Sequence, residues 1–461
     1  MFWYAKHMAT MNLQGKKAVV MGLGRFGGGV GVAAWLAEQG AEVLVTDMQV
    51  EDELTESLAK LKAHPMTFYL GGHDEAHFVN ADLVVVSPAV RRAGNRYLNV
   101  ARDAGALITS EIELLLERLP NPDHIVGITG TSGKSTTTAM LGRALGAAQT
   151  TWVGGNIGGS LLAKLPKIKA EDYVVLELSS FMLQGISERT EPLRIGAGVI
   201  TNFSDNHLDW HADLGEYRDA KSVLLAMLCG RGHAVFGPGV AAAGFAAADS
   251  VPVTHVATED GDDLQMRLAG RFNQTNAAVV RAVCKVFDQW DERAQAAVEQ
   301  FEGLPHRMQF VGAWQLGGLS VLAHNDSKCT TTTGAIAAIK SFADSQQTVH
   351  VILGGYDKGD DYVALGREAA RLAKRVYTLG DVQERIAEGV VQAGGQVVVC
   401  DYLDQAVREI YAHLGRDEAG QPQTILLSPG CASWDQFANY EQRGEQFAKL
   451  VAEAFEGVGA S

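Results

Sequence analysis

The feature that most constrains the fold of this chain is a repeated pattern: a short run of β-branched residues, then a glycine-rich or polar turn, then a helical pattern. The runs lie at 17–24, 41–47, 81–90, 124–130, 173–180, 196–204, 320–328, 348–355, 375–380, 396–401 and 423–430. This alternation predicts parallel sheets joined by crossover helices. Because such sheets bind ligands at the carboxyl ends of their strands, we expect the functional residues just after these runs.

The length of the chain predicts more than one domain. At 461 residues it exceeds one ordinary hydrophobic core, and about 150 residues per domain suggests roughly three domains. Glycine and proline interrupt the pattern at 102–111 and at 302–307. We therefore expect domain boundaries near these two segments.

Composition excludes several functional classes. The formal net charge of −15 argues against sequence-independent binding of nucleic acid, which needs clustered basic residues. No run approaches the roughly 20 apolar residues of a membrane span, and the first residues do not have the pattern of a secretory signal. The scattered cysteines Cys229, Cys284, Cys329, Cys400 and Cys431 have neither disulfide-framework nor zinc spacing. We expect a cytoplasmic protein with no membrane span and no nucleic-acid partner.

A phosphate-binding turn is predicted at 124–141, where HIVGITGTSGKSTTTAML runs from an apolar strand through Gly-Lys-Ser into a helix. In such a turn backbone N–H groups surround phosphate oxygens, Lys134 neutralises them and the Ser135 hydroxyl faces Mg²⁺. The general form of the motif has a glycine five residues before Gly133, where this chain has Ile128. The turn predicts a nucleoside triphosphate, which we expect to be ATP.

A second glycine cluster follows the first predicted strand. Gly22, Gly24 and Gly27 form G-x-G-x-x-G, and Asp47 ends the next strand. The pattern is typical of a loop that binds a dinucleotide or another nucleotide diphosphate at a helix N-terminus. The alternative is that the glycines only permit tight packing between strand and helix.

Longer motifs carry a family resemblance. They are TGTSGKSTTT (129–138), GGNIG (154–158), LELSSF (176–181), NFSDNHLD (202–209), YRDAK (217–221), GLPHR (303–307), NDSK (325–328), LGGYDKGDD (353–361) and SPGCASWDQFANYEQRG (428–444). In this order they resemble the Mur ligases, most closely the branch that adds D-glutamate to UDP-N-acetylmuramoyl-L-alanine. The resemblance spans nearly the whole chain.

The resemblance implies an α/β fold of three consecutive Rossmann-like domains. They would be a UDP-substrate-binding domain at 1–108, a central P-loop ATP-binding domain at 109–303 and a C-terminal doubly wound amino-acid-binding domain at 304–461. It also implies ATP-dependent amide formation through an acyl phosphate, in the synthesis of a peptidoglycan precursor. The implied enzyme is a monomer.

Catalytic roles implied by the resemblance fall on Lys134, Glu177, His207, Lys221 and Lys328. Glu177 and His207 would bind one Mg²⁺, and Ser135 would face a second. Lys221 would react with CO₂ to form a carbamate that organises the metal site, which requires a desolvated amine of lowered pKa. From the residues alone, a strand-end glutamate is more often a helix cap, a single histidine more often a core residue, and Lys221 a solvated helix charge.

The resemblance also assigns the nucleotide sites. The implied ATP site comprises Gly130, Thr131, Ser132, Gly133, Lys134, Ser135, Thr136, Asn273, Asn276, Arg307 and Asp326. The implied UDP-substrate site comprises Gly24, Arg25, Phe26, Asp47, Asn156 and His207. The chain departs from the family pattern at Phe272, where a histidine is usual, at 48–49, which lack Thr-Arg, and at Ala89, where glycine is common.

The C-terminal part is expected to select the amino acid. A dicarboxylic amine needs cationic and hydroxyl partners, and Lys328, Lys358 and Ser433 follow three different predicted strands. By resemblance the amino-acid site comprises Thr330, Lys358, Ser433, Trp434 and Tyr440, while Asp326 and Lys328 face the nucleotide. Trp434 and Tyr440 stand where leucine and phenylalanine are common. The D-N-P-R motif of ligases that add diaminopimelate or lysine is absent, which favours glutamate.

Two alternatives stay open from the sequence. One is a related ligase that uses another amino acid, such as L-glutamate, or a folate-like acceptor. The other is a non-catalytic nucleotide-binding or NAD-dependent protein, which would leave Glu177, His207 and Lys221 without a common purpose.

Overall fold

The structure is a computed structural model that describes residues 11–24, 27–189, 193–204, 210–228, 230, 232–268, 270–344, 346–414 and 421–456. The chain divides into two compact units: the first comprises Met1–Gly261 and Thr275–Ala297, the second Asp262–Gln274 and Val298–Ser461. Among the described residues, no helix is both long and apolar enough to cross a lipid bilayer.

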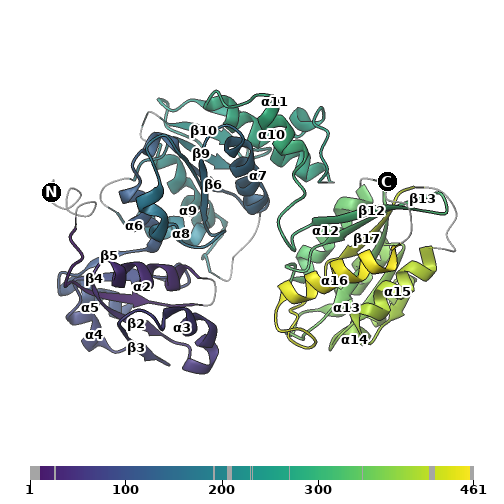
Figure 1. Ribbon diagram of the computed structural model, residues 1–461, viewed down its shortest axis with the longest axis horizontal. Helices are drawn as coiled ribbons and strands as arrows, with labels where there is room; N and C mark the ends of the chain where they lie inside the picture. Colours follow the sequence, from purple (N-terminus) through teal and green to yellow (C-terminus); the bar gives the residue numbers. More distant parts are fainter. Residues whose placement is uncertain are drawn as a thin grey trace. The chain divides into compact units, whose positions relative to one another are not determined.

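The first unit begins with a parallel sheet of strand order β3-β2-β1-β4-β5 (Figure 1). Its strands are β1 (Lys17–Met21), β2 (Glu42–Asp47), β3 (Met66–Leu70), β4 (Leu83–Val86) and β5 (Leu107–Thr109), and its helices α2 (Gly28–Glu38), α3 (Thr55–Leu61), α4 (Glu75–Val79) and α5 (Arg96–Asp103). Alternate residues of β1 enter opposite cores: Ala18 and Val20 lie in one core with α2, whereas Val19 and Met21 lie in another with α4 and α5. The continuous apolar run of this strand therefore reflects burial on both faces.

A second parallel sheet in the same unit has the order β11-β10-β9-β6-β8-β7. Its strands are β6 (Ile125–Thr129), β7 (Thr151–Gly155), β8 (Tyr173–Glu177), β9 (Ala197–Ile200), β10 (His233–Phe236) and β11 (Val253–His255). The accompanying helices are α6 (Glu111–Arg118), α7 (Lys134–Gly146), α8 (Ser180–Ser187), α9 (Leu214–Ala226), α10 (Arg271–Val286) and α11 (Glu292–Glu299). Every residue of β6 is buried between β8 and β9, so the loop after β6 leaves the interior of the sheet.

The second unit contains a sheet of order β12-β13-β17-β14-β15-β16. Its strands are β12 (Gln309–Leu316), β13 (Leu319–Asn325), β14 (Thr348–Gly354), β15 (Arg375–Leu379), β16 (Val397–Val399) and β17 (Gln423–Leu427). Helices α12 (Thr332–Asp344), α13 (Tyr362–Leu372) and α14 (Gln383–Gln392) pack on one face, and α15 (Leu403–Leu414) and α16 (Tyr440–Ala454) on the other. Among the described strand pairs of this sheet, the hairpin β12-β13 alone is antiparallel. Its turn is Gly317-Gly318, and both glycines have positive φ.

The α/β fold with three largely parallel sheets is confirmed, and each run expected from the sequence contains a strand. The strands that the pattern missed are β3, β5, β7, β10, β11 and β12. All of these except β10 are edge strands. An edge strand is covered less completely than a central one, so its sequence need not be continuously apolar; in β3 the side chains of Thr67, Phe68 and Tyr69 are exposed.

Helices α13 and α14 approach each other at two glycines. A Cβ on Gly366 would lie 2.1 Å from the carbonyl oxygen of Ile386, and one on Gly389 would lie 2.1 Å from that of Val363. These distances leave no room for a side chain, so the helix contact depends on bare backbone.

We expect Gly366→Ala to lower the free energy of unfolding by about 1–3 kcal/mol, because the added methyl group forces the two helices apart. Chemical denaturation of both proteins measures the difference. Gly146→Ala is the matched control, since this helical glycine has no atom within 4 Å of the added Cβ. In an open position alanine favours a helix by about 1 kcal/mol. Stabilisation by Gly366→Ala would contradict the proposed close contact.

Candidate active site

The loop after β6 has the geometry of a phosphate-binding turn. Gly130 and Gly133 have φ of 147° and 78°, and Gly133 is the N-cap of α7. A Cβ would lie 2.0 Å from Thr201 Oγ1 at Gly130 and 2.6 Å from Asn276 Oδ1 at Gly133. Both positions therefore require glycine for conformation and for space. The first N–H groups of α7 have no acceptor within the helix, which suits them to an anion.

The neighbouring strand β9 braces this loop. Thr201 Oγ1 donates to Ser132 O at 2.7 Å, and Ser132 N donates to Asn202 Oδ1 at 2.9 Å. Thr131 N donates to Asn202 O at 3.1 Å. Because β9 pairs directly with β6, these bonds fix the loop to the sheet on one side. The turn is thus shaped before any ligand binds.

Two lysines converge on one carbonyl oxygen of the loop. Gly130 O accepts from Lys134 Nζ at 3.1 Å and from Lys221 Nζ at 2.8 Å. Lys221 is 1% exposed and lies with Nζ 4.4 Å from the centre of the Tyr217 ring. Burial, together with the charge of Lys134, lowers the pKa of Lys221 to about 6. Lys221 is therefore a buried amine that is mainly uncharged at neutral pH, and its interpretation as a solvated helix charge is wrong.

Glu177 is a buried carboxylate with one unused oxygen. It ends β8 opposite Ile128 of β6 and is 2% exposed. Its Oε1 accepts from Asn156 Nδ2 at 3.0 Å, whereas Oε2 has no hydrogen-bond partner among the described residues. A buried anionic oxygen without a donor is costly unless a cation meets it. The residue types here fit Mg²⁺, with Ser135 in the first turn of the helix that follows β6.

Some predicted residues cannot be placed. His207, Arg25 and Phe26 lie outside the described residues. Within the described part of the chain, no group of three or more His, Cys, Asp or Glu side chains is arranged to hold a metal ion. The structure thus brings Glu177 and Asn156 together, while the contribution of His207 stays a prediction.

Helix α10 carries two residues of the predicted ATP site, Asn273 and Asn276. Asn276 is buried against the phosphate-binding loop at Gly133. Asn273, one turn earlier, is also buried. Phe272, which replaces the usual histidine, has 41% of its surface exposed.

In the N-terminal sheet, Asp47 supports the glycine loop. Its Oδ2 accepts from Leu23 N at 2.7 Å and Gly24 N at 3.1 Å, and its Oδ1 accepts from Gln49 N at 2.9 Å. These backbone donors already engage both carboxylate oxygens. The Asp47 carboxylate therefore holds the backbone of the glycine loop at Leu23 and Gly24.

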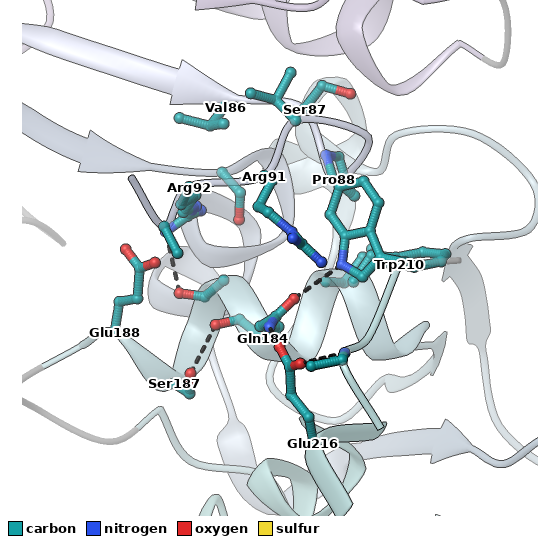
Figure 2. A pocket seen from close by; sticks show the side chains of 17 residues that line it. Val86, Ser87, Pro88, Arg91, Arg92, Gln184, Ser187, Glu188, Trp210 and Glu216 are labelled. Carbon is teal, nitrogen blue, oxygen red and sulfur yellow. Dashed lines mark hydrogen bonds between the residues drawn. The ribbon is translucent and has the colours of Figure 1, made fainter. Parts of the chain in front are cut away.

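A cavity of about 370 Å³ lies between the segment after β4 and helices α8 and α9 (Figure 2). Trp210 Nε1 donates to Gln184 Oε1 at 3.0 Å, and Gln184 Nε2 donates to Glu216 Oε1 at 2.7 Å. The Arg91 guanidinium lies 5.5 Å from the centre of the Trp210 ring. Chiefly the N–H of Ala212 keeps the pKa of Glu216 below its ordinary value. None of the residues predicted for a site lines this cavity. The sequence did not predict the cavity, because its walls come from distant segments with no shared local motif.

In the second unit, Asp326 is a buried carboxylate after β13. Its Oδ2 accepts from Ser428 Oγ at 2.8 Å and its Oδ1 from Met308 N at 3.1 Å. Burial raises the pKa of Asp326 to about 6, against the opposing effect of these bonds and of Arg307. Arg307 stands between His306 and Met308, which both have positive φ. Left-handed backbone at non-glycine residues is strained and often occurs at functional sites.

Four of the five predicted amino-acid residues lie on loops after three strands, which are adjacent because β17 pairs with both β13 and β14. The fifth, Tyr440, is the first residue of α16. Lys328 Nζ lies 5.3 Å from the centre of the Tyr440 ring, and Lys358 Nζ lies 5.6 Å from that of Trp434. The two lysines are exposed, as is Trp434 at 59%. Ser433 is buried and Thr330 is partly buried. The arrangement presents ammonium and hydroxyl groups at the carboxyl edge of one sheet.

Comparison with known proteins gives matches along the chain. The family models that match are the "Mur ligase MurD-like, N-terminal domain" at 16–110, the "Mur ligase middle domain" at 128–237 and the "Mur ligase, glutamate ligase domain" at 306–431. The UDP-N-acetylmuramoylalanine--D-glutamate ligase of Roseiflexus sp. (strain RS-1) is 36% identical over 96% of this chain and 99% of that protein. The ligase of the same name from Geotalea uraniireducens (strain Rf4) is 36% identical over 97% and 100%.

Solved structures agree in fold. The UDP-N-acetylmuramate-alanine ligase MurC from Thermotoga maritima has a TM-score of 0.58 at 17% identity and covers 95% of this chain and 100% of its own. A structure of MurF from Acinetobacter baumannii has a TM-score of 0.58 at 15% identity, with coverage of 97% and 99%. The phosphate-binding turn, the three sheets and these full-length matches show that the chain belongs to the Mur ligase family, in its MurD-like branch.

Proposed function

We propose that this chain is an ATP-dependent ligase that joins D-glutamate to UDP-N-acetylmuramoyl-L-alanine in peptidoglycan precursor synthesis. The observation that carries the proposal is the phosphate-binding turn with uncharged Lys221 beneath it, in a chain similar over nearly its whole length to ligases of that name.

The reaction explains why cations are needed around the turn. The acceptor carboxylate attacks the γ-phosphorus of ATP, ADP leaves, and an acyl phosphate forms. The amine then attacks the acyl carbon, phosphate leaves with the C–N bond made, and the amine loses a proton. Two unit negative charges at 4 Å repel by about 4 kcal/mol at an effective dielectric constant near 20. Lys134 and Arg307 are the protein cations that we assign to offset this repulsion.

Magnesium, when bound, would shield the phosphate charges. We assign one ion to Glu177 and His207 and a second to the Ser135 hydroxyl. The unused Oε2 of Glu177 supports the first assignment. Lys221 would carry a carbamate, since a neutral buried amine is the form that reacts with CO₂.

The remaining site residues divide by substrate. We assign ATP to 130–136 with Asn273, Asn276 and Asp326, and the UDP-substrate to Gly24, Arg25, Phe26, Asp47 and Asn156. We assign D-glutamate to Thr330, Lys358, Ser433, Trp434 and Tyr440, with Lys328 toward the nucleotide. Domain boundaries at 108 and 303, a monomeric state and a cytoplasmic location, where ATP and UDP-linked sugars are available, complete the proposal.

The direct test is phosphate release from ATP with UDP-N-acetylmuramoyl-L-alanine and a panel of D- and L-amino acids. We expect release with D-glutamate, and a fall of about 100-fold or more in Lys134→Ala, because this side chain stabilises charge in the transition state. Lys164→Ala, an exposed lysine outside the site, is the control. Preference for L-glutamate would favour the related ligase, and release that ignores the acceptor would refute amide formation.

We expect Lys221→Met to lose most of its turnover and the ¹³C-carbamate NMR signal that wild-type protein shows with ¹³C-bicarbonate. Lys340→Met, which removes an exposed lysine, should retain both. A full carbamate signal in Lys221→Met would place the modification elsewhere.

The variant Lys221→Met also tests the lowered pKa of Lys221, because this pKa makes the stability of the protein depend on pH. The folded pKa of Lys221 is about 6, against about 10.4 unfolded, so between these values the unfolded chain binds more protons. The buried amine thus destabilises the ligand-free fold increasingly as pH falls from about 10 to about 6, and by a constant amount below that. Lys221→Met should raise Tm more at about pH 7 than at about pH 10. An equal shift at both pH values would contradict this.

We expect Lys358→Ala to raise the KM for D-glutamate about tenfold or more, because one carboxylate partner is lost. Steady-state kinetics with each substrate varied in turn measures the change, and the KM for ATP should stay near its wild-type value. The exposed Lys340→Ala on α12 is the matched control. If the KM for ATP rises instead, Lys358 belongs to the nucleotide site.

A further inference from the structure

Arg443 is the largest fully buried side chain of the described residues, with 1% of its surface exposed. It lies in the first turns of α16. Its Nε donates to Ser327 Oγ at 3.0 Å, and its Nη2 donates to Ser327 O at 2.9 Å and to Cys431 O at 3.0 Å. Its Nη1 donates to Ala432 O at 3.1 Å. The planar guanidinium therefore binds two loops at once through four hydrogen bonds.

A third loop packs against the same guanidinium. A Cβ on Gly355 would lie 3.1 Å from Arg443 Nη1, so the chain after β14 passes directly beside the guanidinium. Ala432 O, which accepts from Arg443, also accepts from Tyr356 N at 2.9 Å. The guanidinium thus contacts the loops that follow β13, β14 and β17.

These three loops are the ones that carry the proposed amino-acid site. Ser327 lies three residues before Thr330, and Ala432 immediately precedes Ser433. Gly355 lies three residues before Lys358. Each anchor is close along the chain to an assigned side chain, so a shift of the guanidinium would move all three groups together.

The charge of Arg443 is not paired directly. Its hydrogen-bond acceptors are three carbonyl oxygens and one hydroxyl, and in the described part of the chain no carboxylate forms an ion pair with it. Burial lowers the pKa of Arg443 to about 10, opposed by Cys431, by the nearby Asp435 and by Cys329. It remains a cation at neutral pH. A buried cation with neutral partners is stabilised when an anion binds nearby.

We propose that Arg443 is a positioning residue of the amino-acid site: it ties together the loops that carry Thr330, Lys358 and Ser433, and its buried positive charge favours a dicarboxylic amino acid. This inference rests on the proposed function, because it takes these loops to be where D-glutamate binds. The guanidinium acts through the loops and does not itself touch the substrate.

The test compares Arg443→Lys and Arg443→Met with wild-type protein in steady-state kinetics. Arg443→Lys keeps the charge but loses the fork that spans two loops, so we expect the KM for D-glutamate to rise about tenfold, equivalent to about 1.4 kcal/mol. Arg443→Met removes the charge as well and should raise it further. The KM for the acceptor should stay near that of wild-type protein, and the KM for ATP should rise less than that for D-glutamate, because only the loop after β13 also carries residues assigned to the nucleotide.

Circular dichroism and thermal unfolding establish whether each variant folds. If Arg443→Met does not fold, the kinetics of Arg443→Lys still decide the test. Arg375→Lys is the matched control, because Arg375 begins β15 and so lies at the amino ends of the strands of the same sheet, away from the loops at their carboxyl ends. An unchanged KM for D-glutamate in folded variants, or an equal rise in all three KM values, would overturn the positioning role. Wild-type protein that fails to use D-glutamate would instead refute the proposed function.

Discussion

Two lysine side chains meet at one carbonyl oxygen of the phosphate-binding turn, and their closeness determines the charge of this site in the first unit. Lys134 and Lys221 both donate to Gly130 O, and the loop itself is fixed to β9 by Thr201 and Asn202. Lys221 is buried and lies close to the charge of Lys134, so keeping Lys221 protonated as well is costly. Burial and the charge of Lys134 lower the pKa of Lys221 to about 6, so Lys221 is mainly uncharged at neutral pH. The fold thereby gives different surroundings to two lysines that meet at the same carbonyl oxygen.

In the second unit, the buried cationic side chain Arg443 keeps its charge. Arg443 stays protonated because its guanidinium is delocalised and four acceptors surround it. Lys221 has a compact ammonium whose nearby partners are Gly130 O, Thr129 Oγ1 and the face of the Tyr217 ring. Thus the buried Arg443 keeps its charge and contacts three loops, while the buried Lys221 is mainly uncharged at neutral pH.

Much of the fold could be predicted because parallel strands that are buried on both faces are continuously apolar. The five residues of β6 are all buried, and its run was evident. Edge strands such as β3 and β12 carry exposed or half-buried residues and gave no comparable signal. The glycines of the phosphate-binding turn were equally predictable, since Gly130 and Gly133 meet neighbouring atoms where a side chain would stand.

The sequence by itself determined most of the central strands, the phosphate-binding turn and the family, because local pattern and motif spacing encode them. Only the tertiary structure decided that Lys221 is buried beside Lys134, that Asp47 is engaged by backbone donors, and that Arg443 joins three loops. The physical reason is that burial and partnership depend on residues far apart in the chain. The sequence around a lysine on a helix is the same whether its side chain is buried or solvated, and only the atoms packed around the ammonium group determine its pKa.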